Sequence, residues 1–166
     1  MGEGAPDDAE LVRLIELAAT SADHGALRPW RIIALRGEAR ERLGQAFVEA
    51  SGLDGNAAEK LAAKPLRAPL LLAIVVSPKP SIKVPEWEQE AAASGVAHTL
   101  SLLLDDAGWG VMWRTGIQVR SDAVHRMHKL APGERLLGWL YVGSRLEGTP
   151  KPRPPLDAAS HLSTLR

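Results

Sequence analysis

ADHGALRPWRIIAL, residues 22–35, places a polar turn directly before an apolar run. Pro29 fixes its own backbone and prevents a helix from continuing, and the apolar residues that follow suit a buried strand. The stretch therefore predicts that a helix ends before Pro29 and that a strand covers Trp30–Leu35. Binding sites are often found where a loop meets a rigid element in this way.

The turn itself carries three residues with useful chemistry. Asp23 offers a hydrogen-bond acceptor, His24 a ring that titrates near neutral pH, and Gly25 a backbone that tolerates left-handed conformations. Two interpretations remain open from these residues alone. They could form part of a site, or they could make an ordinary helix C-cap and turn.

Composition describes an ordinary globular chain. Its 166 residues suit one domain, and 45% hydrophobic and 24% charged residues exclude disordered and membrane classes. Twenty basic residues balance 20 acidic ones, which does not favour general nucleic-acid binding, and the lack of cysteine excludes disulfides and thiolate sites. The acidic start carries no targeting signal, and the longest apolar run, residues 70–76, is too short to cross a bilayer. We expect a cytoplasmic protein.

Helical and strand patterns alternate along the chain, which predicts an α/β or α+β layered domain. The first helix begins at Asp7 and Asp8 and has an apolar stripe at three-and-four spacing. Further helices are expected over residues 38–50, 57–63, 86–107 and 121–129, with a loop at Gly52, Gly55 and Asn56, and strands over 30–35, 70–76, 109–115 and 135–142. One domain is predicted over residues 1–147, with a proline-rich extended tail over 148–166.

The long helix expected over residues 86–107 has a surface of very small side chains around Gly95. A glycine inside a helix costs about 1 kcal/mol relative to alanine, so close packing against another backbone is the expected compensation. This composition predicts a central helix or a helix between subunits.

Metal chemistry has one candidate. His125 and His128 lie three residues apart, with Asp122 on the same predicted helix face, a spacing that can hold a metal. A solvated polar face explains the same residues, and we expect no metal. His98 is interpreted as a hydrogen-bonded packing residue and His161 as exposed.

Three separate segments share a further pattern: DHGALRPWR at 23–31, VPEWEQ at 84–89 and WRTG at 113–116. Together and in this order they resemble the compact branch of the FMN-dependent nitroreductase family. That family has an Asp-His turn leading to Pro-Trp-Arg, a Val-Pro-x-Trp-Glu-Gln segment before its central helix, and a Trp-Arg-Ser/Thr-Gly turn. The resemblance covers nearly the whole chain and includes the Gly-Thr-Pro segment at residues 148–150.

The resemblance implies an α+β fold, a three-layer sandwich whose central mixed sheet is flanked by helices. It implies a homodimer that holds FMN between its subunits, with NADH or NADPH as donor and a nitroaromatic or quinone-like small molecule as acceptor. His24 matches the turn histidine that contacts the flavin, and Trp113, Arg114 and Thr115 match the turn that approaches it from the other side. Flavin carries the hydride chemistry, so no catalytic side chain is assigned, and neither metal, membrane nor nucleic acid is implied.

The chain departs from the family pattern at its N-terminus. Family members have an Arg-Arg-Ser segment that holds the FMN phosphate, which this sequence lacks, and Thr20 stands where a flavin-contacting arginine is usual. Losing two or three charge-assisted hydrogen bonds would weaken FMN binding by roughly three to six orders of magnitude. Three hypotheses follow: a longer natural chain that binds FMN, a flavin-poor non-catalytic homologue, or a small-molecule-binding protein that uses the cleft.

Overall fold

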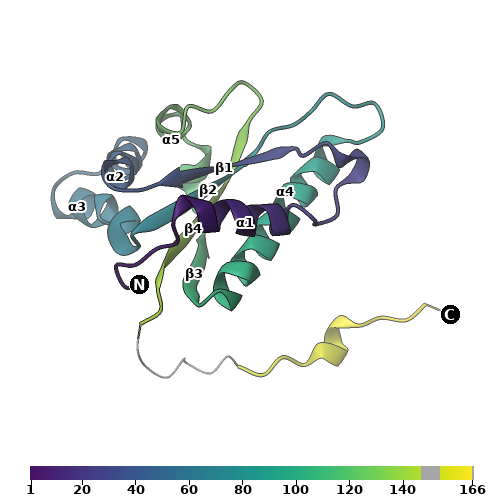
Figure 1. Ribbon diagram of the computed structural model, residues 1–166. Helices are drawn as coiled ribbons and strands as arrows, with labels where there is room; N and C mark the ends of the chain where they lie inside the picture. The colour runs from purple at the N-terminus through teal and green to yellow at the C-terminus, as the bar shows by residue number, and fades with distance from the viewer. Residues whose placement is uncertain (147–153, 166) are drawn as a thin grey trace.

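A four-stranded sheet in the order β1-β2-β4-β3 forms the middle layer of the computed structural model, which describes residues 1–146 and 154–165 (Figure 1). Its strands are β1 (Trp30–Leu35), β2 (Leu70–Val76), β3 (Trp109–Arg114) and β4 (Arg135–Ser144). All three strand pairings are antiparallel.

Helices cover both faces of the sheet, so the predicted α+β three-layer sandwich is confirmed (Figure 1). One face is covered by α1 (Asp8–Ala18) and α4 (Glu86–Asp106). The other is covered by α2 (Glu38–Ser51), α3 (Gly55–Ala62) and α5 (Asp122–Met127). We refer to these as the α4 face and the α2 face.

The sheet differs from the expected mixed sheet, because no parallel pairing occurs among the described residues. The physical reason lies in the connection between β2 and β3. Helix α4 carries the chain back along the sheet, so β2 and β3 run in the same direction, as in other helical crossovers. However, β4 lies between them and pairs with both in the antiparallel sense.

Strand β2 is the centre of both hydrophobic cores. All seven of its residues are buried, which explains why its sequence shows no polar alternation. Leu70, Leu72 and Ile74 pack on the α4 face, whereas Leu71, Ala73 and Val75 pack on the α2 face.

Most predicted elements begin and end within two residues of their observed bounds, and β1 and β2 match them fully. The expected loop at Gly55 and Asn56 is wrong, because α3 begins at Gly55 with Asp54 at its N-cap position. Close packing also differs from the expectation. A Cβ on Gly95 would lie 3.8 Å from Ser21, an ordinary contact, whereas a Cβ on Gly44 would lie 2.3 Å from the Ala62 oxygen.

Residues 154–165 are exposed and contain one 3-10 turn, Ala158–His161, so the tail is not extended throughout. The predicted domain boundary at 147–148 and the Gly-Thr-Pro segment at 148–150 lie outside the described residues. The division into domain and tail therefore stays a prediction. Within the described ranges, no helix combines the length and apolarity needed to cross a bilayer.

Candidate functional site

The loop between α1 and β1 is held in an unusual backbone conformation. It contains a 3-10 turn, His24–Ala26, and has positive φ at Gly25 (75°), Ala26 (50°) and Arg28 (47°). Side chains make this conformation costly, and such residues cluster at functional sites. The Asp23 carboxylate stabilises the loop by accepting a hydrogen bond from the Arg28 backbone N–H at 2.7 Å.

His24 is oriented by the first turn of α4. Its Nδ1 lies 2.7 Å from Oε2 of Glu88, and its side chain is 59% exposed. A carboxylate beside one ring nitrogen fixes the orientation of the ring and leaves the other nitrogen available. The residue predicted from the Asp-His turn is therefore positioned and accessible.

A hollow of about 510 Å³ opens beside this loop on the side of α1 and β1. Its lining includes Thr20, Trp30 and Arg28. Arg28 was not singled out from the sequence. What marks Arg28 is its positive φ immediately before a proline, and sequence alone does not reveal that backbone angle. Arg28 and Thr20 thus line the same hollow, and the resemblance implies an arginine at the position of Thr20.

Trp113, near the end of β3, lies on the α4 face and packs edge-on against His98 with ring centroids 4.9 Å apart. Its indole nitrogen is buried and has no hydrogen-bond partner in the described part of the chain. Buried donors without a partner are rare in folded proteins. His98 is exposed, and its contact is aromatic, where a hydrogen-bonded role was expected.

Arg114 and Thr115 line a different pocket, on the α2 face. The Arg114 guanidinium carbon lies 5.5 Å from the centre of the Tyr141 ring. Successive side chains of a strand point to opposite faces, so Trp113 and Arg114 are separated by the sheet. Gly138 on β4 makes room for both: a Cβ there would lie 2.5 Å from the Arg114 oxygen and 2.9 Å from the Trp113 indole nitrogen.

The four predicted cofactor-binding residues therefore fall into two groups. Helix α4 links His24 with Trp113 through Glu88 and His98. Those two contact points are ten positions apart in the helix, which is about 15 Å along its axis. The side chains of Arg114 and Thr115 line the pocket on the far side of the sheet.

The two histidines with metal-ligand spacing, His125 and His128, each place a ring nitrogen against a backbone oxygen. The Nε2 atom of His125 lies 3.0 Å from the Val119 oxygen, and Nδ1 of His128 lies 2.8 Å from the Val124 oxygen. No group of three or more possible metal ligands occurs in residues 1–146 and 154–165.

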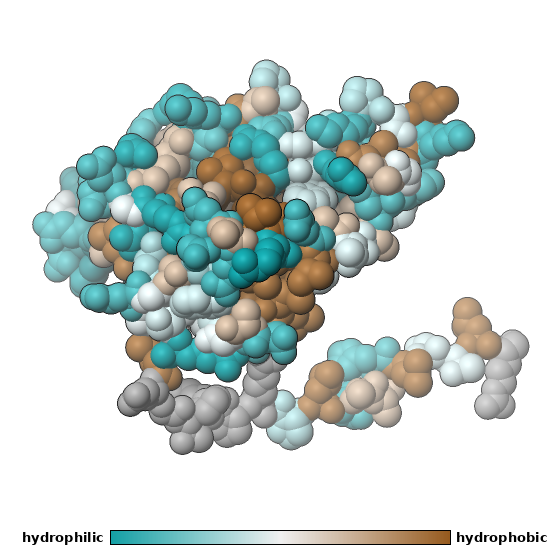
Figure 2. Space-filling model, in the orientation of Figure 1, coloured by the Kyte–Doolittle hydropathy of each residue, from teal (hydrophilic) through white to brown (hydrophobic). Residues whose placement is uncertain are grey.

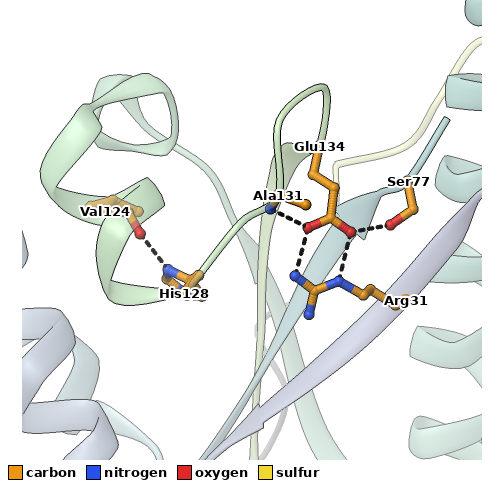
Figure 3. A network of polar contacts seen from close by, with 6 residues as sticks. All are labelled: Arg31, Ser77, Val124, His128, Ala131 and Glu134. Carbon is orange, nitrogen blue, oxygen red and sulfur yellow. Dashed lines mark hydrogen bonds and ion pairs between the residues drawn. The ribbon is translucent and has the colours of Figure 1, made fainter.

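A polar network ties the ends of three strands together (Figure 3). Both carboxylate oxygens of Glu134 bind the Arg31 guanidinium at 2.7 Å, and the Ser77 hydroxyl also donates to Glu134. The pKa of Glu134 is lowered to about 2, first by the hydrogen bonds from Arg31 and then by those from Ser77 and the Ala131 N–H, against burial, which raises it. All its charged members have partners, so we assign this network to stability.

Comparison with known proteins gives a consistent result across sequence and structure. The model of the Nitroreductase family matches residues 3–144. Among curated relatives, YdjA of Escherichia coli strain K12, whose name places it among the NAD(P)H nitroreductases, is 29% identical over 147 residues. That match covers 87% of this chain and 80% of YdjA.

Solved structures share the fold at lower sequence identity. A nitroreductase-like family protein from Bacillus cereus superposes with a TM-score of 0.84 at 19% identity, covering 99% of this chain and 88% of that one. The FMN and NADPH-dependent nitroreductase NfnB from Sphigopyxis sp. strain HMH gives a TM-score of 0.65 at 18% identity. It covers 94% of this chain and 91% of NfnB.

Proposed function

We propose that this chain, which belongs to the nitroreductase family, uses FMN to transfer hydride from NADH or NADPH to a small electron-poor acceptor. Nitroaromatics and quinones are the acceptor class. The family assigns an oxidoreductase of the nitroreductase type. The fold is shared with NfnB, an FMN and NADPH-dependent nitroreductase, which supports the choice of cofactors for this chain.

The observation that carries the proposal is the buried indole N–H of Trp113, which lacks a partner among the described residues. A buried donor without a partner costs about 1–3 kcal/mol, and a ligand with acceptor atoms in its plane would recover that energy. FMN has such acceptors, and when bound it supplies the hydride chemistry. Trp113 would donate its indole N–H to the edge of that ring, with His98 packed edge-on against the indole.

The loop residues complete the binding role. We assign His24, held by Glu88, to the opposite edge of the flavin, and Arg28 to its anionic part in place of the arginine that Thr20 replaces. Residues Arg114 and Thr115 contribute the turn that ends β3. These residues bind and orient the cofactor and exclude water, and the proposed reaction needs no nucleophile among them.

The proposal includes a homodimer, for which the surface of the α4 face gives support. Figure 2 shows hydrophobic side chains gathered over α1 and the adjoining part of α4. Large apolar side chains exposed on these two helices include Leu17 (55%) on α1, and Leu102 (72%) and Trp87 (70%) on α4. Such a concentration is typical of a protein interface. A stable monomer in sedimentation at micromolar concentration would contradict this part of the proposal.

The test is a visible spectrum of the purified chain before and after FMN addition and desalting, followed by NAD(P)H oxidation with a quinone acceptor. We expect flavin absorption that persists through desalting. Trp113→Phe should lower flavin retention, because it removes the donor and keeps the ring. Trp109→Phe is the matched control, since the Trp109 indole N–H already binds Glu10 at 2.9 Å and lies at the other end of β3.

Two results would redirect the interpretation. Retained flavin without NAD(P)H oxidation would favour the alternative, a non-catalytic flavin-binding homologue. A colourless protein that gains flavin only when extended upstream would place the missing binding groups in a preceding segment. Equal flavin retention in the Trp113 and Trp109 variants would remove Trp113 from the site.

A further inference from the structure

A hollow of about 400 Å³ opens on the α2 face, beside β1 at the outer edge of the sheet. Three elements meet there: the second half of β1, the first two turns of α2 and the end of α5 (Figure 1). It shares no residue with the hollow beside the α1–β1 loop or with the pocket lined by Arg114 and Thr115. Its size lies within the usual range for small-molecule sites, about 300–1,000 Å³.

The floor of the hollow is mainly aliphatic and is fixed by the core. Leu35 is 2% exposed, and Ile33, Ala39 and Met127 pack against the same hydrophobic cluster. The ring of His128, which is 5% exposed, also lines the hollow. A floor of this kind suits a hydrocarbon chain, whose burial is favourable in proportion to the apolar area removed from water.

The rim carries two positive charges, from Arg42 and Lys129, and no aspartate or glutamate lines the hollow within the described part of the chain. The Arg42 guanidinium lies 3.6 Å from Oε2 of Glu38, but both side chains are exposed, so this ion pair contributes little. Lys129 takes part in no ion pair within residues 1–146 and 154–165. Two cations beside an aliphatic floor are complementary to a carboxylate that carries a hydrocarbon chain.

Lys129 also holds a costly backbone conformation. Its φ is 51°, just after the end of α5, where glycine or asparagine is usual. Its backbone N–H donates to the Arg126 oxygen at 3.0 Å, and the next N–H, of Leu130, donates to the His125 oxygen at 3.1 Å. Residues held in such conformations cluster at functional sites, which favours a role for the Lys129 side chain at the hollow.

We propose that this hollow binds a small aliphatic carboxylate, with its hydrocarbon chain on the floor and its carboxylate at the rim formed by Arg42 and Lys129. Burial of the chain supplies most of the affinity, because partly exposed charges contribute less than apolar area does. The planar guanidinium of Arg42 matches the two oxygens of a carboxylate. The site is separate from the proposed flavin site and goes beyond the proposed oxidoreductase function.

The experiment is calorimetric titration of the full chain with butanoate, hexanoate and octanoate at constant ionic strength. We expect saturable binding that tightens about two- to fourfold per added methylene until the hollow is filled. The uncharged analogue 1-pentanol has the same alkyl chain as hexanoate and should bind at least about threefold more weakly. Higher salt should weaken hexanoate binding, because salt screens the charges at the rim.

Three variants locate the ligand. Lys129→Asn removes one charge and keeps a residue that tolerates positive φ, and Arg42→Gln removes the other charge. Each should weaken hexanoate binding about three- to tenfold. Ala39→Leu fills part of the hollow and leaves both charges, so affinity should stop rising at a shorter chain length. Lys60→Gln, on the exposed side of α3 and outside the hollow, is the matched control and should bind hexanoate within about twofold of the wild type.

Thermal unfolding of all four variants checks that the fold is intact. The proposal is overturned if none of the three carboxylates binds saturably, or if the Lys129→Asn and Lys60→Gln variants bind hexanoate equally well. Hexanoate binding that is lost in Trp113→Phe and kept in Lys129→Asn would place the carboxylate at the flavin site and overturn it too. No hexanoate binding, together with a changed sedimentation coefficient for Ala39→Leu, would assign the hollow to a contact between two copies of the chain.

This test is separate from that of the proposed function. The titration needs no flavin, and Lys129→Asn should retain flavin as the wild type does. Loss of hexanoate binding with unchanged flavin retention therefore concerns only this hollow.

Discussion

Trp139 donates its indole N–H to Nε2 of His128 across 3.0 Å in the core between β4 and α5. The opposite nitrogen of His128 donates to the Val124 oxygen at 2.8 Å (Figure 3). The ring is therefore neutral in the folded chain, with its proton on Nδ1. Burial lowers the pKa of His128 below its ordinary value, since a charged imidazole there would lose its solvation and its bond from Trp139.

This geometry predicts acid-sensitive stability. Below the ordinary histidine pKa of 6.5, the unfolded chain binds a proton at His128 that the folded chain excludes. The free energy of unfolding should therefore fall as pH falls from 6.5 toward the lower folded pKa. Chemical denaturation at several pH values measures this, and His128→Leu should flatten the slope. His161→Gln, in the exposed turn, should leave it unchanged.

The contact between Glu134 and Arg31 predicts a second stability effect. Glu134→Gln should lower the free energy of unfolding at neutral pH by about 2 kcal/mol, because it removes a charged acceptor from four hydrogen bonds. The pKa of Glu134 is lowered from 4.5 to about 2, so the contribution is complete above pH 4.5 and is lost between those values. Glu49→Gln breaks an exposed pair and should cost less than about 0.5 kcal/mol. Equal losses in both variants would contradict the assignment.

A side chain at position 44 would cause α2 and α3 to clash. Alanine improves helix propensity by about 1 kcal/mol. At Gly44, however, the added Cβ would lie 2.3 Å from the Ala62 backbone oxygen, so α3 must move. We expect Gly44→Ala to lower the free energy of unfolding by about 1–3 kcal/mol. Gln45→Ala, on the exposed side of the same helix, should cause no loss, and a stabilised Gly44 variant would refute the packing argument.

Arg28 predicts opposite effects on stability and on flavin retention. Arg28→Gly should raise the free energy of unfolding by about 0.5 kcal/mol, because glycine adopts a φ of 47° without strain. It should also lower FMN retention after desalting, since it removes the guanidinium that lines the hollow beside Thr20. Arg28→Lys keeps the strain and the charge, so its stability should stay near that of the wild type.

The elements could be predicted from local sequence, whereas their arrangement could not. The apolar run Leu70–Val76 and the run after Pro29 define buried strands by residue type alone. Sheet order depends on which strands meet in space, and no local pattern shows that β4 would separate β2 from β3. The missed start of α3 was a local error, because Asp54, which stands at the N-cap position, is a residue type that often precedes a helix.

The sequence names candidate site residues but does not show how they are grouped in space. The motifs singled out His24, Trp113, Arg114 and Thr115, and these assignments stay predictions. The predicted strand already implies that Trp113 and Arg114 lie on opposite faces. What the sequence did not reveal is which of the two faces α4, because no local pattern fixes which alternating set packs against that helix. Arg28 escaped notice because its signal is a backbone angle.

Gly138 also couples ligand binding on one face of the sheet to ligand binding on the other. One missing side chain accommodates both the Arg114 backbone and the Trp113 indole, so a shift of either neighbour changes the space left for the other. A molecule that moved the end of β3 from one side would alter the affinity for a molecule on the other side. Such coupling is reciprocal, since each ligand must change the binding constant of the other by the same factor. Two ligands bound on opposite faces, without touching, would then change each other's affinity through the small space that the missing side chain of Gly138 leaves.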